Sequence, residues 1–251
     1  ASTRPFPASG TPWKPSGPGA REKMGKPARL PVVAIDGPSA AGKSTVGKAL
    51  ASRLGYLYID TGALYRAVGW LARQNGLDTG KGAEVAELIG RTEFGLFEDG
   101  GRRRVTVNGR DISEEIRTEA AGHLASTFSA LPEVRDGLLD IQRKLGRSGG
   151  VVMDGRDIGT VICPEAEVKL FVTASAEVRA RRRYDELLAK GHEVTLEAVL
   201  ADVQSRDARD SDRATAPLIP ADGAVVLDTS ELSVDEAVAT AIAAVQATRA
   251  I

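Results

Sequence analysis

Residues 37–44 read Gly-Pro-Ser-Ala-Ala-Gly-Lys-Ser, which fits the pattern G-x-x-x-x-G-K-[ST]. A short apolar run at 31–35 precedes this stretch and predicts a buried strand, while residues 43–54 carry apolar side chains at helical spacing. A strand, a glycine-rich turn and a helix, in that order, form the setting in which a phosphate-binding P-loop occurs. The stretch therefore predicts an α/β fold with a phosphate site at the start of the helix.

Each residue type in this loop has a chemical reason to be there. Gly37 and Gly42 allow the backbone to curl so that its N–H groups face phosphate oxygens. Lys43 supplies a cation for the outer phosphates of ATP, and the hydroxyl of Ser44 is a ligand for Mg²⁺. A glycine-rich turn that binds nothing is the alternative, and the complete motif in its context disfavours it. The predicted ATP-binding set is Gly37, Pro38, Ser39, Ala40, Ala41, Gly42, Lys43, Ser44 and Thr45.

Composition limits the classes of protein that this chain fits. Its 251 residues suit one domain with insertions or two small domains, and the net charge of −1 gives no nucleic-acid signature. No apolar run approaches the roughly 20 residues that span a bilayer. The single cysteine excludes a disulfide framework and favours a reducing, cytoplasmic compartment. Residues 1–29 are basic and rich in proline and glycine, which predicts a disordered tail; docking to an acidic partner is the less favoured interpretation.

Alternating apolar runs and helical patterns predict a three-layer α/β/α domain. The strand-like runs are nearly continuous in hydrophobicity, which is typical of parallel strands covered on both faces. They predict a central five-stranded parallel sheet, with strands at 31–35, 56–59, 150–153, 168–172 and 224–227. Helices are expected at 43–54, 62–74, 117–128, 132–146, 175–190, 195–209 and 233–248.

One segment departs from this alternation. Short runs at 93–98, 103–108 and 111–112 alternate apolar and polar residues and are separated by Asp-Gly-Gly and Asn-Gly turn signals. They predict a small antiparallel β-insert at 84–114, with one wet face. We interpret the insert as a mobile flap on the substrate side.

The predicted strand ends carry polar residues. Four of the runs lead directly into an aspartate, namely Asp36, Asp60, Asp154 and Asp228. Ligands of open α/β sheets bind beyond the carboxyl ends of the strands, so these residues are placed for chemistry. Asp154 matches the strand-end carboxylate that contacts Mg²⁺ in P-loop enzymes, and Arg156 and Asp157 share its loop. Arg66, early in the helix after the second strand, could reach an anion at the same edge.

Two arginine clusters follow later in the chain. Four arginines lie within 179–183, where they repel one another unless they meet anions, and Arg206, Arg209 and Arg213 share helical spacing with Asp210. Salt-bridged surface helices are the ordinary explanation of such clusters. Beside a P-loop they instead favour a role in surrounding a transferring phosphoryl group with cations. The residues therefore predict a phosphotransferase that closes over its substrates to exclude water.

From about residue 31 onward the chain resembles the bacterial cytidylate kinases. The motifs that carry this resemblance are 35–45, 60–66, 154–161, 206–214, 216–218 and 227–228. The resemblance implies a nucleoside monophosphate kinase fold, with a core at 30–83 and 115–251, a substrate-binding insert at 84–114 and a lid at 180–193. It implies that ATP phosphorylates CMP or dCMP in the presence of Mg²⁺. The tail at 1–29 is not part of the family core, and a monomer is expected.

The same resemblance implies individual roles. Ser126, Arg135 and Asp157 would read the cytosine, and Asp210 with Arg206 would hold the ribose. The implied phosphate-binding residues are Arg66, Arg156 and Arg213, with Arg182 and Arg183 as lid arginines and Thr61 as a further substrate contact. Cytosine presents an amino donor and two acceptors, which a carboxylate or hydroxyl and an arginine match.

Direct in-line transfer is the expected mechanism, because the acceptor phosphate is already an anionic nucleophile. Two alternatives remain. A P-loop kinase for another acceptor, UMP first among them, would share most of these residues. A nucleotide-dependent switch is the alternative from another class, but the chain lacks the Asn-Lys-x-Asp element of guanine-specific switches. The acceptor-side arginines would also have no purpose in a switch.

Overall fold

The computed structural model describes residues 29–99 and 102–249, and the chain divides into two compact units. One unit combines Pro31–Asp60 with residues 150–249 and contains the P-loop. The other consists of Thr61–Gly149 with Arg29 and Leu30. The prediction of a tail at 1–29 falls almost entirely outside the described residues.

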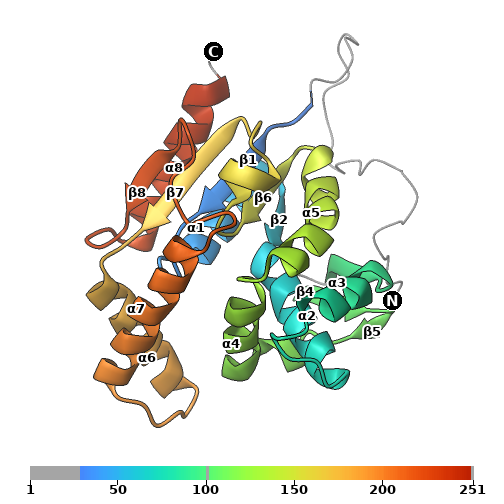
Figure 1. The fold of residues 1–251 in the computed structure, drawn as a ribbon. Coiled ribbons are helices and arrows are strands. Elements are labelled where there is room, and N and C mark those ends of the chain that lie inside the picture. The colour runs from blue at the N-terminus through green and yellow to red at the C-terminus, as the bar shows by residue number, and fades with distance from the viewer. Residues whose placement is uncertain (1–28, 100–101, 250–251) are drawn as a thin grey trace. The chain divides into compact units, whose positions relative to one another are not determined.

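The P-loop unit is built on a five-stranded parallel sheet (Figure 1). Its strands are β1 (Val32–Asp36), β2 (Leu57–Asp60), β6 (Val151–Asp154), β7 (Val168–Thr173) and β8 (Val225–Asp228). They lie in the order β2-β6-β1-β7-β8, and each neighbouring pair is parallel. All five predicted strands are confirmed. Every residue of the central β1 is buried, which explains its uninterrupted hydrophobicity.

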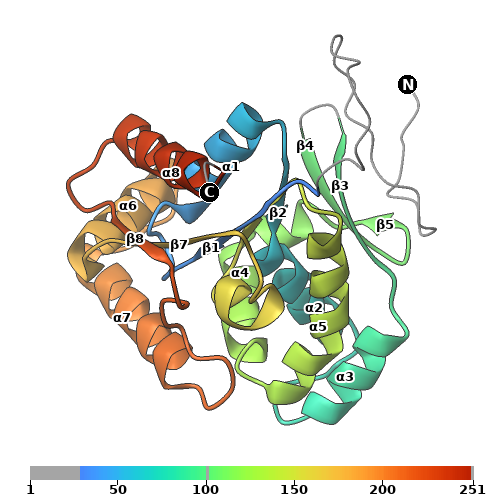
Figure 2. The same ribbon diagram turned by 90° about the horizontal axis from the view of Figure 1, so that it is seen from above.

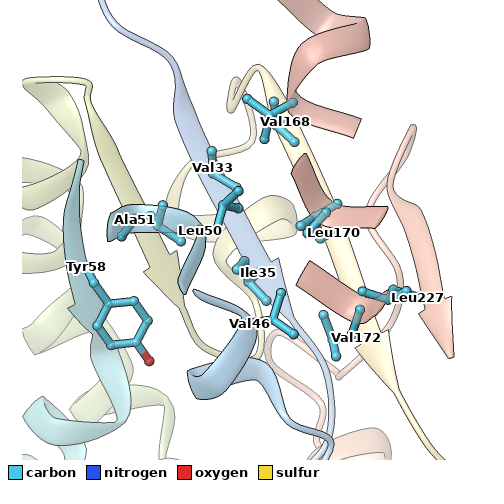
Figure 3. Packing of buried hydrophobic residues seen from close by; sticks show 14 of the residues in the cluster. Val33, Ile35, Val46, Leu50, Ala51, Tyr58, Val168, Leu170, Val172 and Leu227 are labelled. Carbon is cyan, nitrogen blue, oxygen red and sulfur yellow. The ribbon is translucent and has the colours of Figure 1, made fainter. Parts of the chain in front are cut away.

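Helices α1 (Lys43–Leu54) and α8 (Val234–Arg249) lie together against the sheet (Figures 1 and 2). Val46 and Leu50 of α1 contribute to a core cluster with Ile35 and other strand residues (Figure 3). Helices α6 (Ala176–Ala189) and α7 (Leu196–Asp212) pack on each other through a second cluster of buried aliphatic side chains. A π-helical turn, η2 (Ile158–Ile162), follows β6 and was not predicted.

The second unit is mainly helical and carries the small antiparallel sheet. Its helices are α2 (Thr61–Gln74), α3 (Gly82–Gly90), η1 (Glu115–Arg117), α4 (Glu119–Phe128) and α5 (Pro132–Arg147). The sheet has the order β3-β4-β5, with β3 at Phe94–Asp99, β4 at Arg102–Val107 and β5 at Arg110–Asp111. Val105 and Val107 are buried, so one face of β4 packs inward as the alternation predicted.

The start of the predicted β-insert differs from expectation. Residues 84–90 are helical, because Val85, Leu88 and Ile89 are spaced along one side of α3 and are all buried. Val85 and Ile89 pack with Val134 and Leu138 of α5 in a shared core cluster. Antiparallel pairing therefore begins only at Phe94.

Candidate active site

The P-loop joins the end of β1 to the start of α1 and has the backbone that its sequence requires. Gly37 adopts φ +146°, and a Cβ atom there would overlap the carbonyl oxygen of Val172 on β7. Gly42 is the left-handed N-cap of α1 with φ +88°, and Ala40 also has a positive φ of 58°. The strained turn ends at a helix N-terminus, which is a ready site for phosphate oxygens.

Two side chains of this loop fit an anionic ligand. The hydroxyl oxygen of Ser39 is buried and has no hydrogen-bond partner among the residues that the structure describes. Lys43 is buried, and its Nζ donates to the carbonyl oxygen of Pro38 at 2.6 Å. Burial, followed by the nearby Arg156 cation, lowers the pKa of Lys43 to about 7. A phosphate group would provide the acceptor that Ser39 lacks and the negative charge that favours a protonated Lys43.

Ser44 and Asp154 meet beside the P-loop, as expected for a magnesium site. The Ser44 hydroxyl donates to Oδ2 of Asp154 at 2.8 Å, and the Tyr58 hydroxyl donates to the same oxygen at 2.6 Å. Among the described residues no three His, Cys, Asp or Glu side chains gather to form a complete metal cage. Two hard oxygen ligands fit Mg²⁺, which usually takes its other ligands from substrate phosphates and water.

Tyr58 was not predicted as a site residue. It lies in the hydrophobic run of β2 and is 8% exposed, so the sequence marks it only as part of the core. Burial and then the Asp154 carboxylate raise the pKa of its hydroxyl far above the ordinary value. Tyr58 is therefore a permanently protonated donor to Asp154.

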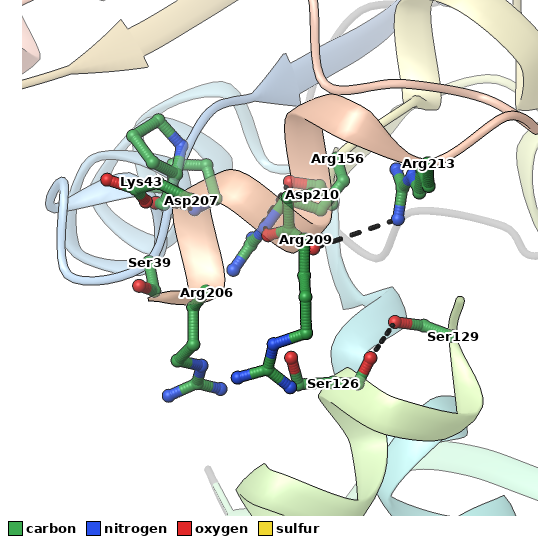
Figure 4. Close-up of polar contacts among 12 residues, drawn as sticks. Ser39, Lys43, Ser126, Ser129, Arg156, Arg206, Asp207, Arg209, Asp210 and Arg213 are labelled. Atoms are coloured by element: carbon green, nitrogen blue, oxygen red, sulfur yellow. Dashed lines mark hydrogen bonds and ion pairs between the residues drawn. The ribbon is translucent and has the colours of Figure 1, made fainter. Parts of the chain in front are cut away.

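Asp210 of α7 gathers two of the predicted phosphate-binding arginines. Arg156 Nε donates to Asp210 Oδ2 at 2.8 Å, and Arg213 Nη1 lies 3.8 Å from Asp210 Oδ1 (Figure 4). Burial alone would raise the pKa of Asp210, but the charge and hydrogen bond of Arg156 together with the Arg213 and Arg206 cations outweigh this effect, and the pKa is lowered. Asp210 thus holds the guanidinium groups of Arg156 and Arg213 together at the end of α7. Nearby on α7, burial and the Arg156 cation lower the pKa of Arg206, which pairs with Asp202 at 3.8 Å.

The arginine cluster of α6 finds its anions within the chain. Arg179 is buried, forms a bidentate pair with Asp207 at 2.6 and 2.9 Å, and donates from Nε to the carbonyl oxygen of Ala174. Arg181 pairs with Asp185 and Arg183 with Glu186. The expectation that these cations meet anions thus holds, but for Arg179, Arg181 and Arg183 the anions are carboxylates of the chain itself.

Arg182 is linked to the P-loop through Thr229. Its guanidinium donates to the Thr229 hydroxyl at 3.0 Å and to the Thr229 carbonyl at 2.7 Å. The hydroxyl oxygen of Thr229 lies in turn 3.1 Å from the carbonyl oxygen of Ala41 in the P-loop. This arrangement keeps Arg182, one of the two predicted lid arginines, close to the phosphate cradle. A Cβ atom added to Gly42 would lie 4.0 Å from Nη1 of Arg182.

The strand-end aspartates do not share one task. Asp36 is buried and accepts from the backbone N–H groups of Ile158 and Gly159, both at 2.7 Å, so it anchors the start of η2. Asp228 is exposed and caps a turn through Ser230. Asp36 acts on Lys43 of the P-loop through its charge, whereas it is Asp154 that accepts the hydrogen bond of Ser44. The expectation that all four carboxylates are placed for chemistry is therefore too broad.

The remaining predicted substrate residues are divided between the units. Arg135 is buried on α5 in the second unit, where its guanidinium lies 5.8 Å from the ring of Tyr65 and donates to Ser129 O. In the same unit the Ser126 carbonyl accepts from the Ser129 hydroxyl at 3.1 Å (Figure 4). Asp157 is buried in the P-loop unit, at the N-cap of η2. Thr61 and Arg66 both lie on α2.

A parallel sheet with a P-loop, a Ser–Asp pair suited to Mg²⁺ and arginines gathered on Asp210 are the features of a P-loop phosphotransferase. Comparison with known proteins gives the family. The family model "Cytidylate kinase" matches residues 33–247, which is most of the chain. The chain belongs to the cytidylate kinase family.

Curated relatives agree with the family model. The cytidylate kinase of Geobacter sp. (strain M21) is 52% identical over 205 residues, covering 82% of this chain and 88% of its own length. The cytidylate kinase of Pseudomonas paraeruginosa (strain PA7) is 47% identical over 218 residues, covering 86% and 95%. Among solved structures, the shikimate kinase of Bacteroides thetaiotaomicron covers 88% of this chain and 98% of its own, at 12% identity and a TM-score of 0.44. That likeness is too weak to add to the argument.

Proposed function

We propose that this protein transfers the γ-phosphoryl group of ATP to CMP or dCMP, giving ADP and CDP or dCDP. The observation that carries the proposal is the joint presence, in a member of the cytidylate kinase family, of a phosphate cradle and of arginines gathered on Asp210. A cradle alone would suit any nucleotide-binding protein. Two guanidinium groups beside the phosphate cradle can bind the phosphate of a second, anionic substrate.

The donor side consists of the P-loop and the Ser44–Asp154 pair. Backbone N–H groups of the loop and the Ser39 hydroxyl would donate hydrogen bonds to the phosphate oxygens of ATP, and Lys43 would neutralise charge on the outer phosphates. Ser44 and Asp154 would hold Mg²⁺, which when bound supplies charge neutralisation at the phosphate oxygens. The role of the chain here is to bind and orient the donor.

The acceptor side is assigned by resemblance together with the contacts around Asp210. Arg156 and Arg213 would exchange part of their pairing with Asp210 for the acceptor phosphate, and Arg66 would join them from α2. Asp210 and Arg206 would hold the ribose, with Thr61 as a further contact. Ser126, Arg135 and Asp157 would select cytosine through its donor and acceptor pattern.

The reaction needs no strong general base, because the acceptor phosphate is already an anion. Catalysis would therefore consist of alignment and charge neutralisation by Lys43, Arg156 and Arg213. Arg182 and Arg183 of α6 would turn from Thr229 and Glu186 toward the transferring group when the substrates are bound. Closure of this kind keeps water from competing with the acceptor.

An acceptor panel tests the proposal. ADP release would be measured with Mg·ATP and CMP, dCMP, UMP, AMP or GMP, and with no acceptor. Strong turnover with CMP and dCMP and little with the others is expected. Preferential turnover of UMP would support the alternative acceptor, and ADP release that ignores the acceptor would indicate a switch or an ATPase.

The expectations on partners and location stay predictions. They comprise a monomer that acts in the cytoplasm on small nucleotides without nucleic-acid or membrane partners. Within the described part of the chain, no helix combines the length and apolarity needed to cross a membrane. The assignments of an insert at 84–114 and a lid at 180–193 likewise stay predictions.

A further inference from the structure

The hydroxyl group of Tyr58 reaches one of the two proposed magnesium ligands from the core of the sheet. Its oxygen lies 2.6 Å from Asp154 Oδ2, and the bond is buried. In Figure 3 the ring of Tyr58 lies along β2 with its oxygen toward the carboxyl ends of the strands. A buried hydroxyl costs free energy unless it is hydrogen-bonded, so a tyrosine that only filled space here would be less favourable than phenylalanine.

The register of the sheet explains how this contact arises. Tyr58 of β2 is paired with Val152 of β6, and Asp60 is paired with Asp154. Side chains two residues apart on a strand share a face, so Tyr58 and Asp154 lie on the same face, one step apart along neighbouring strands. The tyrosine side chain is long enough for its hydroxyl to reach the Asp154 carboxylate from that position.

Helix α1 completes the arrangement above this face. Gly47 lies over the Tyr58 ring so closely that a Cβ atom would come 2.7 Å from Cε2 of the ring. One helical turn earlier, Ser44 reaches the same Asp154 oxygen at 2.8 Å. The absent side chain at Gly47 therefore lets the ring pass beneath the helix that carries the second proposed magnesium ligand.

We propose that Tyr58 is a positioning residue, whose hydroxyl fixes the orientation of the Asp154 carboxylate for a divalent cation. The proposal rests on the proposed function through the assignment of Ser44 and Asp154 to Mg²⁺. Tyr58 and Ser44 donate to one carboxylate oxygen, but only the Ser44 oxygen is also a suitable metal ligand. Tyr58 therefore keeps Asp154 in place when Ser44 turns its lone pair toward the ion.

Substitution Tyr58→Phe isolates the hydroxyl, because it keeps the ring and its packing. Tyr56→Phe is the matched control, since Tyr56 precedes the same strand, is equally buried at 8% and belongs to the same core cluster. Mn²⁺ would serve as the probe, with its binding to the ADP-saturated protein followed by loss of the free-ion paramagnetic resonance signal. ADP alone provides the blank, and ADP affinity without metal is measured separately.

The expected result is about 10-fold weaker Mn²⁺ binding for Tyr58→Phe, with metal-free ADP affinity and circular dichroism unchanged and Tyr56→Phe like the wild type. Equal Mn²⁺ affinity of Tyr58→Phe and wild type would overturn the inference alone and leave the proposed function standing. If Tyr58→Phe lost as much affinity for metal-free ADP as for Mn²⁺, the inference would also be overturned, because the hydroxyl would then have a structural role. If the wild-type protein, saturated with ADP, bound no Mn²⁺ beyond the ADP blank, the magnesium assignment itself would be overturned.

Discussion

Among single residues, Lys43 shows most clearly how burial sets chemistry. Its amino group is enclosed and donates to the Pro38 carbonyl, a neutral acceptor. Burial and the Arg156 cation lower its pKa to about 7. A bound phosphate would stabilise the protonated form and raise this pKa, so nucleotide binding and proton binding are coupled.

We expect nucleotide binding to take up a proton at about pH 8. There the free amine, with a pKa of about 7, is mostly neutral, and binding of ADP phosphates would protonate it, with an uptake approaching about one proton. The uptake should fade below about pH 6, where Lys43 is already charged. Titration calorimetry in buffers of different ionisation enthalpy measures it. Identical uptake in wild type and Lys43→Met would show that another group is responsible.

Loss of the Lys43 cation should impair transfer rather than folding. Lys43→Met keeps a side chain of similar length and removes a charge that is costly to bury, so we expect kcat to fall by about 100-fold or more with the fold intact. Lys48→Met, an exposed change on the same helix, is the control. Near-normal turnover of Lys43→Met would contradict the assigned mechanism. Arg156→Ala should lower kcat as well, but it also leaves buried Asp210 with only the more distant Arg213, at 3.8 Å, of its two ion-pair partners, so the stability of this variant must be measured too.

The elements around the site are held by buried polar contacts between helices. Arg179 of α6 is enclosed by Asp207 of α7, by Ala174 O and, at 3.4 Å, by the P-loop carbonyl of Ser39. One guanidinium therefore links both helices to the phosphate cradle. Asp207 lies on the same helix as Arg206 and Asp210, the proposed acceptor-binding residues. The Arg179–Asp207 pair therefore also helps to position the helix that carries these two residues.

Removal of Asp207 should be far more costly than removal of a neighbouring surface carboxylate. Asp207→Ala leaves the Arg179 charge buried without its partner and should lower the free energy of unfolding by about 3–5 kcal/mol. Asp202→Ala, on the same helix, removes an exposed carboxylate that lies 3.8 Å from the half-buried Arg206, and it should cost less than about 1 kcal/mol. Urea denaturation of both variants checks the difference. Equal losses would mean that the buried pair contributes no more than a surface pair.

Elements bounded by local signals could be predicted from the sequence. The predicted helix at 43–54 has the same bounds as α1, because Gly42 and Gly55 take left-handed conformations at its two ends. Helix α3 was missed although Val85, Leu88 and Ile89 carry a helical pattern, since the region was interpreted as one β-insert. The turn η2 depends on hydrogen bonds from its backbone to Asp36, 122 residues away, which no local pattern reveals.

At the level of the whole molecule, sequence motifs indicate candidate site residues but not the contacts that these residues make. The P-loop, Ser44 and Asp154 could be assigned from motif and strand order alone, and the structure brings them together. The pairing of Arg156 and Arg213 with Asp210, and of Arg179 with Asp207, depends on how loops and helices distant in the sequence pack. The cytosine-reading set draws on both compact units, with Ser126 and Arg135 in one and Asp157 in the other, and its role stays a prediction.

The fate of the γ-phosphoryl group tests the proposed kinase activity most directly. ATP labelled in that group would be mixed with excess protein, Mg²⁺ and CMP for a single turnover, and the products separated. We predict that the label appears in CDP and that little inorganic phosphate forms. Label recovered as inorganic phosphate, equally with and without CMP, would contradict the proposal and reduce the arginines around Asp210 to a structural role.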